Sequence, residues 1–382
     1  MKIGIITIHK SPNYGACLQA YALWKYMEQQ GNDCEIIDLY RPYQEDYVSS
    51  KRFKRMRQNT SFASRYKQAV KRMLGIKKEK GGKLFSDKAK QKFDEFNSQI
   101  KYSRAYKGID ELYADPPIYD LYISGSDQLW NPTQPYCLKP YFLTFVSNGG
   151  RKISYATSIG ITDLTDKEKL KFKDWLSSYD AISVRELQAK KLLESFITDH
   201  VISQVPDPTF LLDVEYWKRL AVNPDIKGKY ILLFTLQWSP VLVEYCKRLS
   251  AESGLQLVVL TQIQPQYTDG GYIPMTDAGP KEFIGYIANA EMVITDSFHC
   301  TVFSIITGAN NFYTYIAPSN IRGSRITDLL DIFEIKGHLL PQSLSLDYVE
   351  LAKCKIERKQ IKEKMFAIRQ QGMNFIDKYT NQ

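Results

Sequence analysis

The sequence lacks the features that mark several large classes of protein. Its 382 residues include six cysteines, at positions 17, 34, 137, 246, 300 and 354, with no CxxC pair, and only four histidines. A disulfide scaffold or a structural zinc site is therefore not expected, and the thiols are most simply reduced, as in a cytoplasm. No apolar run reaches the roughly 20 residues of a membrane helix, and the N-terminus, MKIGIITIHK, reads as a strand instead of a signal peptide.

Several catalytic motifs are missing too. The sequence has no GxGxxG dinucleotide fingerprint, no P-loop, no GxSxG and no Asp-x-Asp motif. No group of His, Cys and carboxylate residues has the spacing of metal ligands. We therefore expect a chemistry that uses neither a metal ion nor a bound cofactor.

What the sequence does contain is a regular alternation of strands and helices. Near-continuous apolar runs, typical of strands buried on both faces, are separated by segments with helical spacing. The predicted strands are 2–8, 34–39, 119–124, 152–156, 181–184, 201–204, 230–236, 256–260, 292–295 and 311–315. This pattern predicts an α/β protein with parallel sheets in two Rossmann-like lobes that face a cleft.

The lobe boundary is predicted at VPDPTFLLD, residues 205–213, which begins Pro-rich and ends apolar. We expect an N-terminal lobe at 1–212, a C-terminal lobe at 213–340, and a long charged helix within 341–382 that packs back on the body. Residues 42 to about 105 interrupt the strand pattern of the first lobe and are predicted to be a mostly helical insertion.

A strongly basic segment lies within this insertion. Between residues 51 and 92 there are 16 Lys and Arg but only two acids, with aromatic and Met residues interspersed. One interpretation is a solvated helical face. The other is a patch that meets an anionic partner such as a membrane surface. Binding to nucleic acid is not expected, because no nucleic-acid motif accompanies the charge.

Polar residues follow the predicted strands of the first lobe, where ligands of open α/β sheets bind. Asn13 and Tyr14 follow the first strand. The segment ISGSDQLWNP places Ser126, Asp127, Gln128 and Trp130 after the predicted strand 119–124. Hydrogen-bonding side chains beside an indole suit a sugar. The alternative is a tight turn with a capping side chain and a core tryptophan.

Cationic and titratable residues follow other strands. Arg185 comes directly after 181–184, and a guanidinium there can bind a phosphate or carboxylate. Ser297 is positioned to cap a helix after 292–295, which places His299 in its first turn. Arg322 and Arg325 lie in a later loop before a helix. His299 is the best candidate for a catalytic group.

Together these stretches resemble the polysaccharide pyruvyl transferase family. The matching segments are NYGACLQAYAL, GSDQLWNP, SYATSIG, SVRE, DPTFLL and TDSFHCTVFSIITG, and they occur in the family's order. The resemblance implies a GT-B-like pair of lobes and a transfer of the enolpyruvyl group of phosphoenolpyruvate to a hydroxyl pair of a glycan. The product is a cyclic pyruvate ketal.

The resemblance also implies roles for individual residues. Arg185 is expected to hold the donor, and His299 to act as general acid or base. Relatives resemble S-x-R-x-H here, whereas this chain has Ser297 at the arginine position. Arg322 or Arg325 then supplies the missing cation, or the donor is held differently. The N-terminal lobe is the expected acceptor side and the C-terminal lobe the donor side.

The resemblance implies a place in exopolysaccharide or capsule synthesis. Acceptors of such enzymes include glycans on a polyprenyl diphosphate at the inner face of the membrane, which gives the basic segment 51–92 a purpose. Two alternatives stay open on the same scaffold. One is a GT-B-type glycosyltransferase that uses a sugar nucleotide, and the other is a non-catalytic glycan-binding relative.

Overall fold

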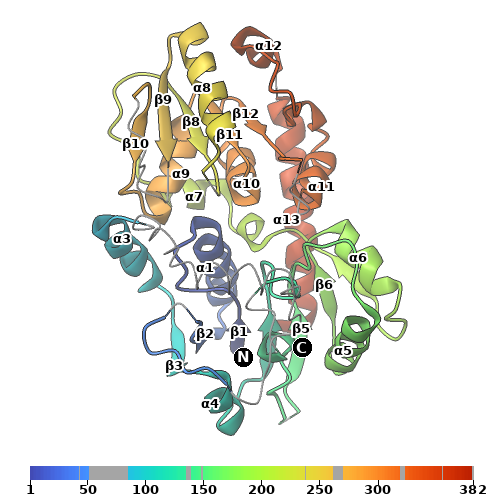
Figure 1. Ribbon diagram of the computed structural model, residues 1–382. Helices are drawn as coiled ribbons and strands as arrows, with labels where there is room; N and C mark the ends of the chain where they lie inside the picture. The colour runs from blue at the N-terminus through green and yellow to red at the C-terminus, as the bar shows by residue number, and fades with distance from the viewer. Residues whose placement is uncertain are drawn as a thin grey trace, which may run out of the picture.

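The computed structural model describes residues 1–382 apart from 43, 51–84, 135–138, 148, 237, 261–269, 319–322, 355 and 381–382. In the described residues the chain forms two α/β lobes, which lie one above the other in Figure 1. Most of the basic segment 51–92 lies outside them, and so does Arg322. None of the described helices is both long and apolar enough to span a bilayer.

The N-terminal lobe is built on five parallel strands in the order β3-β2-β1-β4-β5. Their bounds are β1 Lys2–Ile6, β2 Asp33–Leu39, β3 Tyr102–Tyr106, β4 Leu121–Ser124 and β5 Arg151–Ser154. A small parallel pair, β6 (Ile182–Val184) and β7 (Ile202–Gln204), adjoins the β5 edge through single bridges. The helices of this lobe are α1 (Tyr14–Gln29), α3 (Asp87–Asn97), α4 (Ile109–Ala114), α5 (Asp166–Leu176) and α6 (Leu187–Glu194).

The C-terminal lobe repeats this plan with five parallel strands in the order β10-β9-β8-β11-β12. Their bounds are β8 Tyr230–Phe234, β9 Gln256–Leu260, β10 Ile273–Met275, β11 Met292–Thr295 and β12 Phe312–Thr314. The helices are α7 (Val214–Leu220), α8 (Pro240–Ser253), α9 (Pro280–Asn289), α10 (Phe298–Thr307) and α11 (Ser324–Ile332). β8 and β11 are buried throughout, as expected for central strands of a sheet covered on both faces.

Helix α1 joins the cores of the two lobes. Its Tyr14 ring stacks on Phe283 of α9, with the ring centroids 4.6 Å apart, and its hydroxyl donates to the carbonyl of Ala278 at 2.9 Å. A second link is the ion pair between Lys92 of α3 and Glu282 of α9, at 2.7 Å. One continuous hydrophobic core therefore runs through both lobes.

The last helix, α13 (Arg358–Thr380), runs from the C-terminal lobe back along the N-terminal lobe (Figure 1). Arg369 donates to the carbonyl of Leu211 at 2.9 Å, and the Tyr26 hydroxyl of α1 donates to Asp377 at 3.1 Å. A short helix, α12 (Tyr348–Lys353), precedes α13, because the chain turns extended at Cys354. The single long helix predicted within 341–382 is thus two helices.

The predicted alternation is otherwise confirmed, with one correction inside the insertion. Residues 42–105 are predicted to be mostly helical, but β3 (Tyr102–Tyr106) begins there and forms the edge of the sheet. Its alternating, half-polar sequence, YSRAY, fits an edge strand and lacks the apolar run that identifies the central strands. Strand β10, also half-exposed at a sheet edge, was missed for the same reason.

Candidate active site

The order of strands directs attention to particular loops. In each sheet the order in which strands are added reverses between two neighbouring parallel strands, β1 and β4 in one lobe and β8 and β11 in the other. Ligands of open α/β sheets bind outside the carboxyl ends of the strands at such a point. The loops after β1, β4 and β11 carry the predicted residues Asn13, Asp127 and His299.

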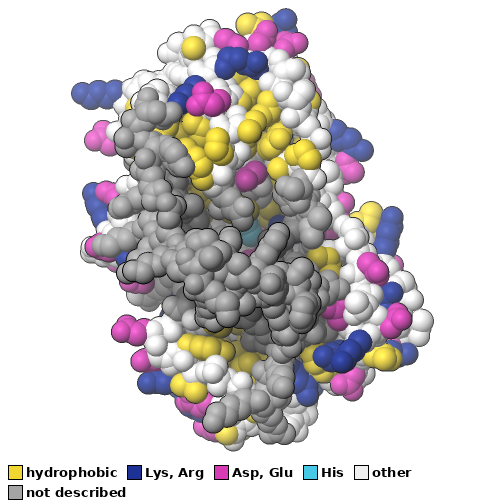
Figure 2. All heavy atoms as spheres, in the orientation of Figure 1, with side chains coloured by type: hydrophobic (Ala, Val, Ile, Leu, Met, Phe, Trp, Pro, Cys, Tyr) yellow, Lys and Arg dark blue, Asp and Glu magenta, His cyan; other side chains and the backbone are white. Residues whose placement is uncertain are grey.

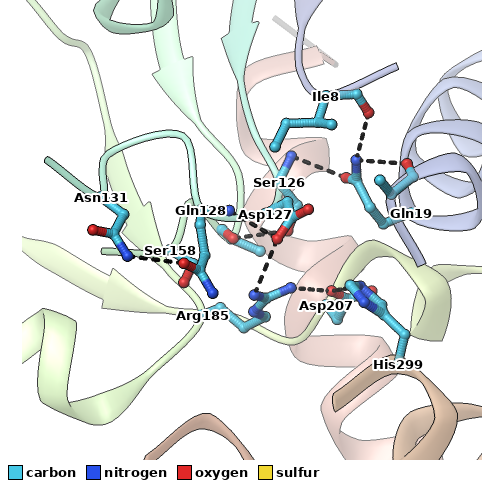
Figure 3. A network of polar contacts seen from close by, with 12 residues as sticks. Ile8, Gln19, Ser126, Asp127, Gln128, Asn131, Ser158, Arg185, Asp207 and His299 are labelled. Carbon is cyan, nitrogen blue, oxygen red and sulfur yellow. Dashed lines mark hydrogen bonds and ion pairs between the residues drawn. The ribbon is translucent and has the colours of Figure 1, made fainter. Parts of the chain in front are cut away.

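A buried carboxylate, Asp207, connects the lobes at this point (Figure 3). Its Oδ2 atom lies 2.6 Å from Nη1 of Arg185 and 3.4 Å from Nε2 of His299. Its Oδ1 atom accepts from the backbone and hydroxyl of Thr209, at 3.0 and 2.7 Å. Asp207 therefore lies between the arginine at the end of β6 and the histidine that begins α10.

Arg185 is almost completely buried but only partly satisfied. Its guanidinium lies 4.3 Å from the ring centroid of Phe298, and Nη2 is 3.8 Å from Asp127. Neither Nε nor Nη2 has a hydrogen-bond partner among the described residues. A buried, charged donor without a partner is costly. These two nitrogens are therefore suited to an anionic ligand.

His299 lies in the first turn of α10, as the sequence predicts. The side chain of Ser297 caps the helix by accepting from the backbone of Cys300, at 3.4 Å. The imidazole packs directly on Gly15 of α1, where an added Cβ would lie 2.1 Å from Nδ1. Only glycine leaves room for this ring. The Nε2 atom has no hydrogen-bond partner in the described part of the chain, although Asp207 is within ion-pair distance.

Arg325 of α11 approaches the same region from the C-terminal lobe. When the Gln128 amide is oriented with its oxygen toward α11, this oxygen accepts hydrogen bonds from Nη2 and Nη1 of Arg325, at 2.7 and 3.0 Å. Arg325 also lies 5.6 Å from the ring centroid of Phe298. A pocket of about 150 Å³ is bounded by Arg185, Glu186, Asp207, Phe298 and Arg325, among other residues.

The two carboxyls of this pocket have opposite net pKa shifts. Burial raises the pKa of Asp207, but the nearby His299 and Arg185 and the backbone of Thr209 lower it more, so the pKa lies well below its usual range. For Glu186, burial raises the pKa, and Arg185 and Arg325 offset this only in part. Ser158 donates to one Glu186 oxygen, and the other has no partner among the described residues.

The predicted acceptor residues of the N-terminal lobe have structural contacts. Asn13 caps α1 by accepting from Ala16, and Tyr14 stacks between the lobes. The buried Ser126 hydroxyl donates to the carbonyl of Ala156 at 2.8 Å. The contacts that join Asp207, Arg185 and His299 form the active-site network. Asp127 and Gln128 lie beside it, next to Arg185 and Arg325.

The placement of Trp130 corrects the sequence analysis, which expects an indole available to a sugar. Trp130 is fully buried, stacks on Phe142 with the ring centroids 5.2 Å apart, and donates from Nε1 to the carbonyl of Tyr141 at 3.1 Å. The ring and its Nε1 atom therefore both have partners inside the protein and are not available to a sugar. The core tryptophan of the alternative interpretation is what the structure contains.

Sequence reasoning missed Asp207 and Glu186. Asp207 lies in the segment predicted as a lobe crossing, and Glu186 directly follows the predicted residue Arg185. The available signal was that each follows a short strand at the same sheet edge. In the residues that the structure describes, no group of three or more His, Cys, Asp or Glu side chains is placed to hold a metal ion.

Comparisons with known proteins concern the family and the fold of the chain. A family model described as polysaccharide pyruvyl transferase matches residues 13–315. A search of curated proteins finds no significant match. The UDP-GlcNAc 2-epimerase of Methanocaldococcus jannaschii, solved with UDP-GlcNAc and UDP, is similar in structure, with a TM-score of 0.52 at 12% identity over 97% of this chain and 100% of that one. A second structure of that epimerase gives 0.52 at 13% identity, over 97% and 99%.

These similarities at low identity establish the fold. The chain has the two-lobed, GT-B-like arrangement that the sequence predicts, and it shares this fold with the UDP-GlcNAc 2-epimerase.

Replacing Trp130 tests its place in the core. We expect Trp130→Ala to lower the free energy of unfolding by about 3–5 kcal/mol, because it empties a buried aromatic site. Urea denaturation followed by circular dichroism measures the change. Phe366→Ala, which removes an aromatic ring that is 71% exposed, is the matched control and should change little. An equally small effect at Trp130 would contradict the assignment.

Replacing Asp207 tests the network. Asp207→Asn leaves the Arg185 charge buried without its carboxylate, and we expect a loss of about 3–5 kcal/mol in the free energy of unfolding. Asp213→Asn is the control, because Asp213 is an exposed helix cap and asparagine caps equally well. Equal stability of the two variants would show that Asp207 does not compensate Arg185.

Asp296, which follows β11, generates a pH prediction. Burial raises its pKa from 3.8 to about 6, and Oδ1 accepts from the backbone of Leu236 at 2.8 Å. The folded state therefore binds this proton more tightly than the unfolded state, and stability falls as pH rises through about 6. Relative to wild type, Asp296→Asn should gain about 1–3 kcal/mol between about pH 4.5 and pH 7.5. Urea denaturation at both pH values measures this, and a pH-independent difference would contradict it.

Proposed function

Because the chain belongs to the polysaccharide pyruvyl transferase family, we propose that it transfers the enolpyruvyl group of phosphoenolpyruvate to a glycan. The acceptor is a pair of hydroxyls on a cell-surface glycan or its lipid-linked precursor, and the product is a pyruvate ketal. The family is one of transferases, so the protein is an enzyme. The family is established, and the identities of the donor and the acceptor are proposed.

One observation carries the proposal, namely the incomplete bonding of Arg185 beside His299. Phosphoenolpyruvate carries a phosphate and a carboxylate, and a guanidinium binds either through two parallel hydrogen bonds. Arg185 offers Nε and Nη2, neither bonded to any described residue, on the side of the guanidinium left open by Asp207. Arg325 adds a second cation across the Phe298 ring and can replace the arginine that Ser297 does not provide.

The reaction needs one proton transfer to the donor and two from the acceptor, one from each hydroxyl. Protonation of the donor methylene carbon makes the neighbouring carbon electrophilic, and the first acceptor hydroxyl adds to it and loses its proton. The bond to phosphate then breaks, and the second hydroxyl closes the ring while its proton leaves with the phosphate. The pair of His299 and Asp207 is suited to the proton transfer, because the carboxylate lies 3.4 Å from Nε2 and can orient the imidazole. The two arginines stabilise the negative charge of the donor.

The acceptor is expected on the side of the N-terminal lobe. Asp127 remains the best-placed acceptor residue there, because its carboxylate lies next to Arg185 and is partly exposed. The basic segment 51–92 keeps its proposed contact with an anionic membrane, which would bring a lipid-linked acceptor and a cytoplasmic enzyme together. Most of that segment lies outside the described residues.

The proposal is tested by release of phosphate from phosphoenolpyruvate. We expect release only when a suitable glycan is present, with a matching mass increase of that glycan. His299→Ala should lower the rate about 10²–10⁴-fold, the usual contribution of a general acid or base. Arg185→Lys should weaken donor binding, because lysine cannot make the paired hydrogen bonds.

The matched control is His200→Ala, which removes a partly exposed histidine bonded to the carbonyl of Tyr179, away from the network. Its activity should equal that of wild type. Full activity of His299→Ala would remove His299 from the mechanism. Turnover of a sugar nucleotide, with no phosphate release across a broad set of glycans, would favour the glycosyltransferase alternative.

A further inference from the structure

A second and larger pocket lies apart from the active-site network. It has a volume of about 570 Å³, within the usual range for a small-molecule site. Its walls come from the segment after η2 (Pro208–Leu211), from α7, from the C-terminal end of α10 and from α13. Figure 1 shows α13 beside α10 on the way to the N-terminal lobe.

The lining of this pocket is mainly apolar. Leu212, Ile305, Ile306 and Met365 are among the side chains that form it, and Phe366 adds an aromatic ring that is 71% exposed. A ring of that size left exposed next to an apolar pocket is typical of a binding site. These walls favour a ligand with a flexible hydrocarbon portion.

The hydroxyl groups in the lining are already bonded within α10. Ser304 donates to the carbonyl of Cys300 at 2.8 Å, and Thr307 donates to that of Phe303 at 2.7 Å. A sugar needs many free donors and acceptors, and these two groups do not offer them. A glycan is therefore a poor match for this pocket.

Basic side chains at the pocket provide charge for an anionic head group. Arg358 and Arg369 bond to the backbone carbonyls of Gly308 and Leu211, and neither forms an ion pair with another described residue. Lys362 forms no ion pair in the described part of the chain. Lys218 is paired with Glu215, and Asp213 is occupied as the cap of α7. The net charge at the pocket is therefore positive.

We propose that this pocket binds a single-chain anionic amphiphile, with its aliphatic chain between α10 and α13 and its phosphate or carboxylate at Arg358 and Lys362, which are one helical turn apart. The ligand needs both parts, because the apolar walls match its aliphatic chain and the basic residues match its anionic head group. Arginine and lysine are the side chains that proteins use to bind such head groups.

This site is distinct from the active site, although one helix connects them. α10 carries His299 in its first turn, and its lining residues begin at Ser304, about 7.5 Å further along the helix at 1.5 Å per residue. Phe210 of η2 lines both this pocket and the one beside Arg185. The proposal stands independently of the donor and acceptor proposed above.

Isothermal titration calorimetry with dodecyl phosphate, below its micelle concentration, tests the proposal on the full chain. We expect saturable binding at one site, at least about tenfold tighter than that of uncharged dodecyl maltoside. Butyl phosphate should bind at least about tenfold more weakly, because it lacks the chain. Millimolar phosphoenolpyruvate should not displace dodecyl phosphate, which separates this site from the active site.

Two variants locate the site. Met365→Trp fills the pocket and Lys362→Glu reverses one of its charges, and each should weaken binding at least about tenfold. Lys359→Glu is the matched control, because it makes the same charge change on α13 outside the lining and should bind like wild type. Lys362 is exposed, so its variant keeps the test valid if Met365→Trp unfolds.

Three results would overturn the proposal. Absence of saturable binding rules out the ligand class, and equal binding of the uncharged amphiphile rules out the anionic head. The third is a wild-type dimer, seen by light scattering, that Lys362→Glu converts to a monomer without loss of dodecyl phosphate binding. That result would assign the pocket to a second copy of the chain.

Discussion

The site depends on the contact between Asp207 and Arg185. A guanidinium whose side chain is 3% exposed is held by a carboxylate that is 1% exposed, at 2.6 Å. A buried charge of this kind is tolerated only when a partner compensates it. Asp207 has its other oxygen bonded to Thr209, so its direction is fixed, and its second contact reaches His299 in the opposite lobe. The segment that crosses between the lobes therefore also aligns the two residues proposed to act on the donor.

The two sheets explain why these residues meet. Both sheets have the same strand order. In both, the polar loops leave the carboxyl ends of the strands next to the point at which that order reverses. Helix α1 brings these ends together, since Tyr14 packs on α9 and Gly15 lies against the ring of His299. The sequence NYG thus acts mainly in the junction of the lobes. This is a different use from the acceptor contact expected of Tyr14.

The lobes, the central strands and the position of His299 could be predicted because each leaves a local signal. Apolar runs identify buried strands, and Ser297 two residues before His299 identifies a helix start. The edge strand β3 could not be predicted in this way, because an edge strand is half-polar and resembles a helical or irregular segment. Trp130 shows a similar limit, since an indole among polar neighbours has the same sequence whether it faces a ligand or the core. Asp207 was missed because its two partners are distant in sequence, at the end of β6 and the start of α10.

The return of α13 to the N-terminal lobe has a consequence for the order of folding during synthesis. Tyr26 of α1 bonds to Asp377, 351 positions later, and Leu211 bonds to Arg369. The contacts of α13 with the end of α1 and with the crossing segment therefore cannot form until α13 has been made. Domains usually fold as units from the N-terminus onward as they are made. Here the lobe that is translated first gains its last contacts only after α13 has left the ribosome.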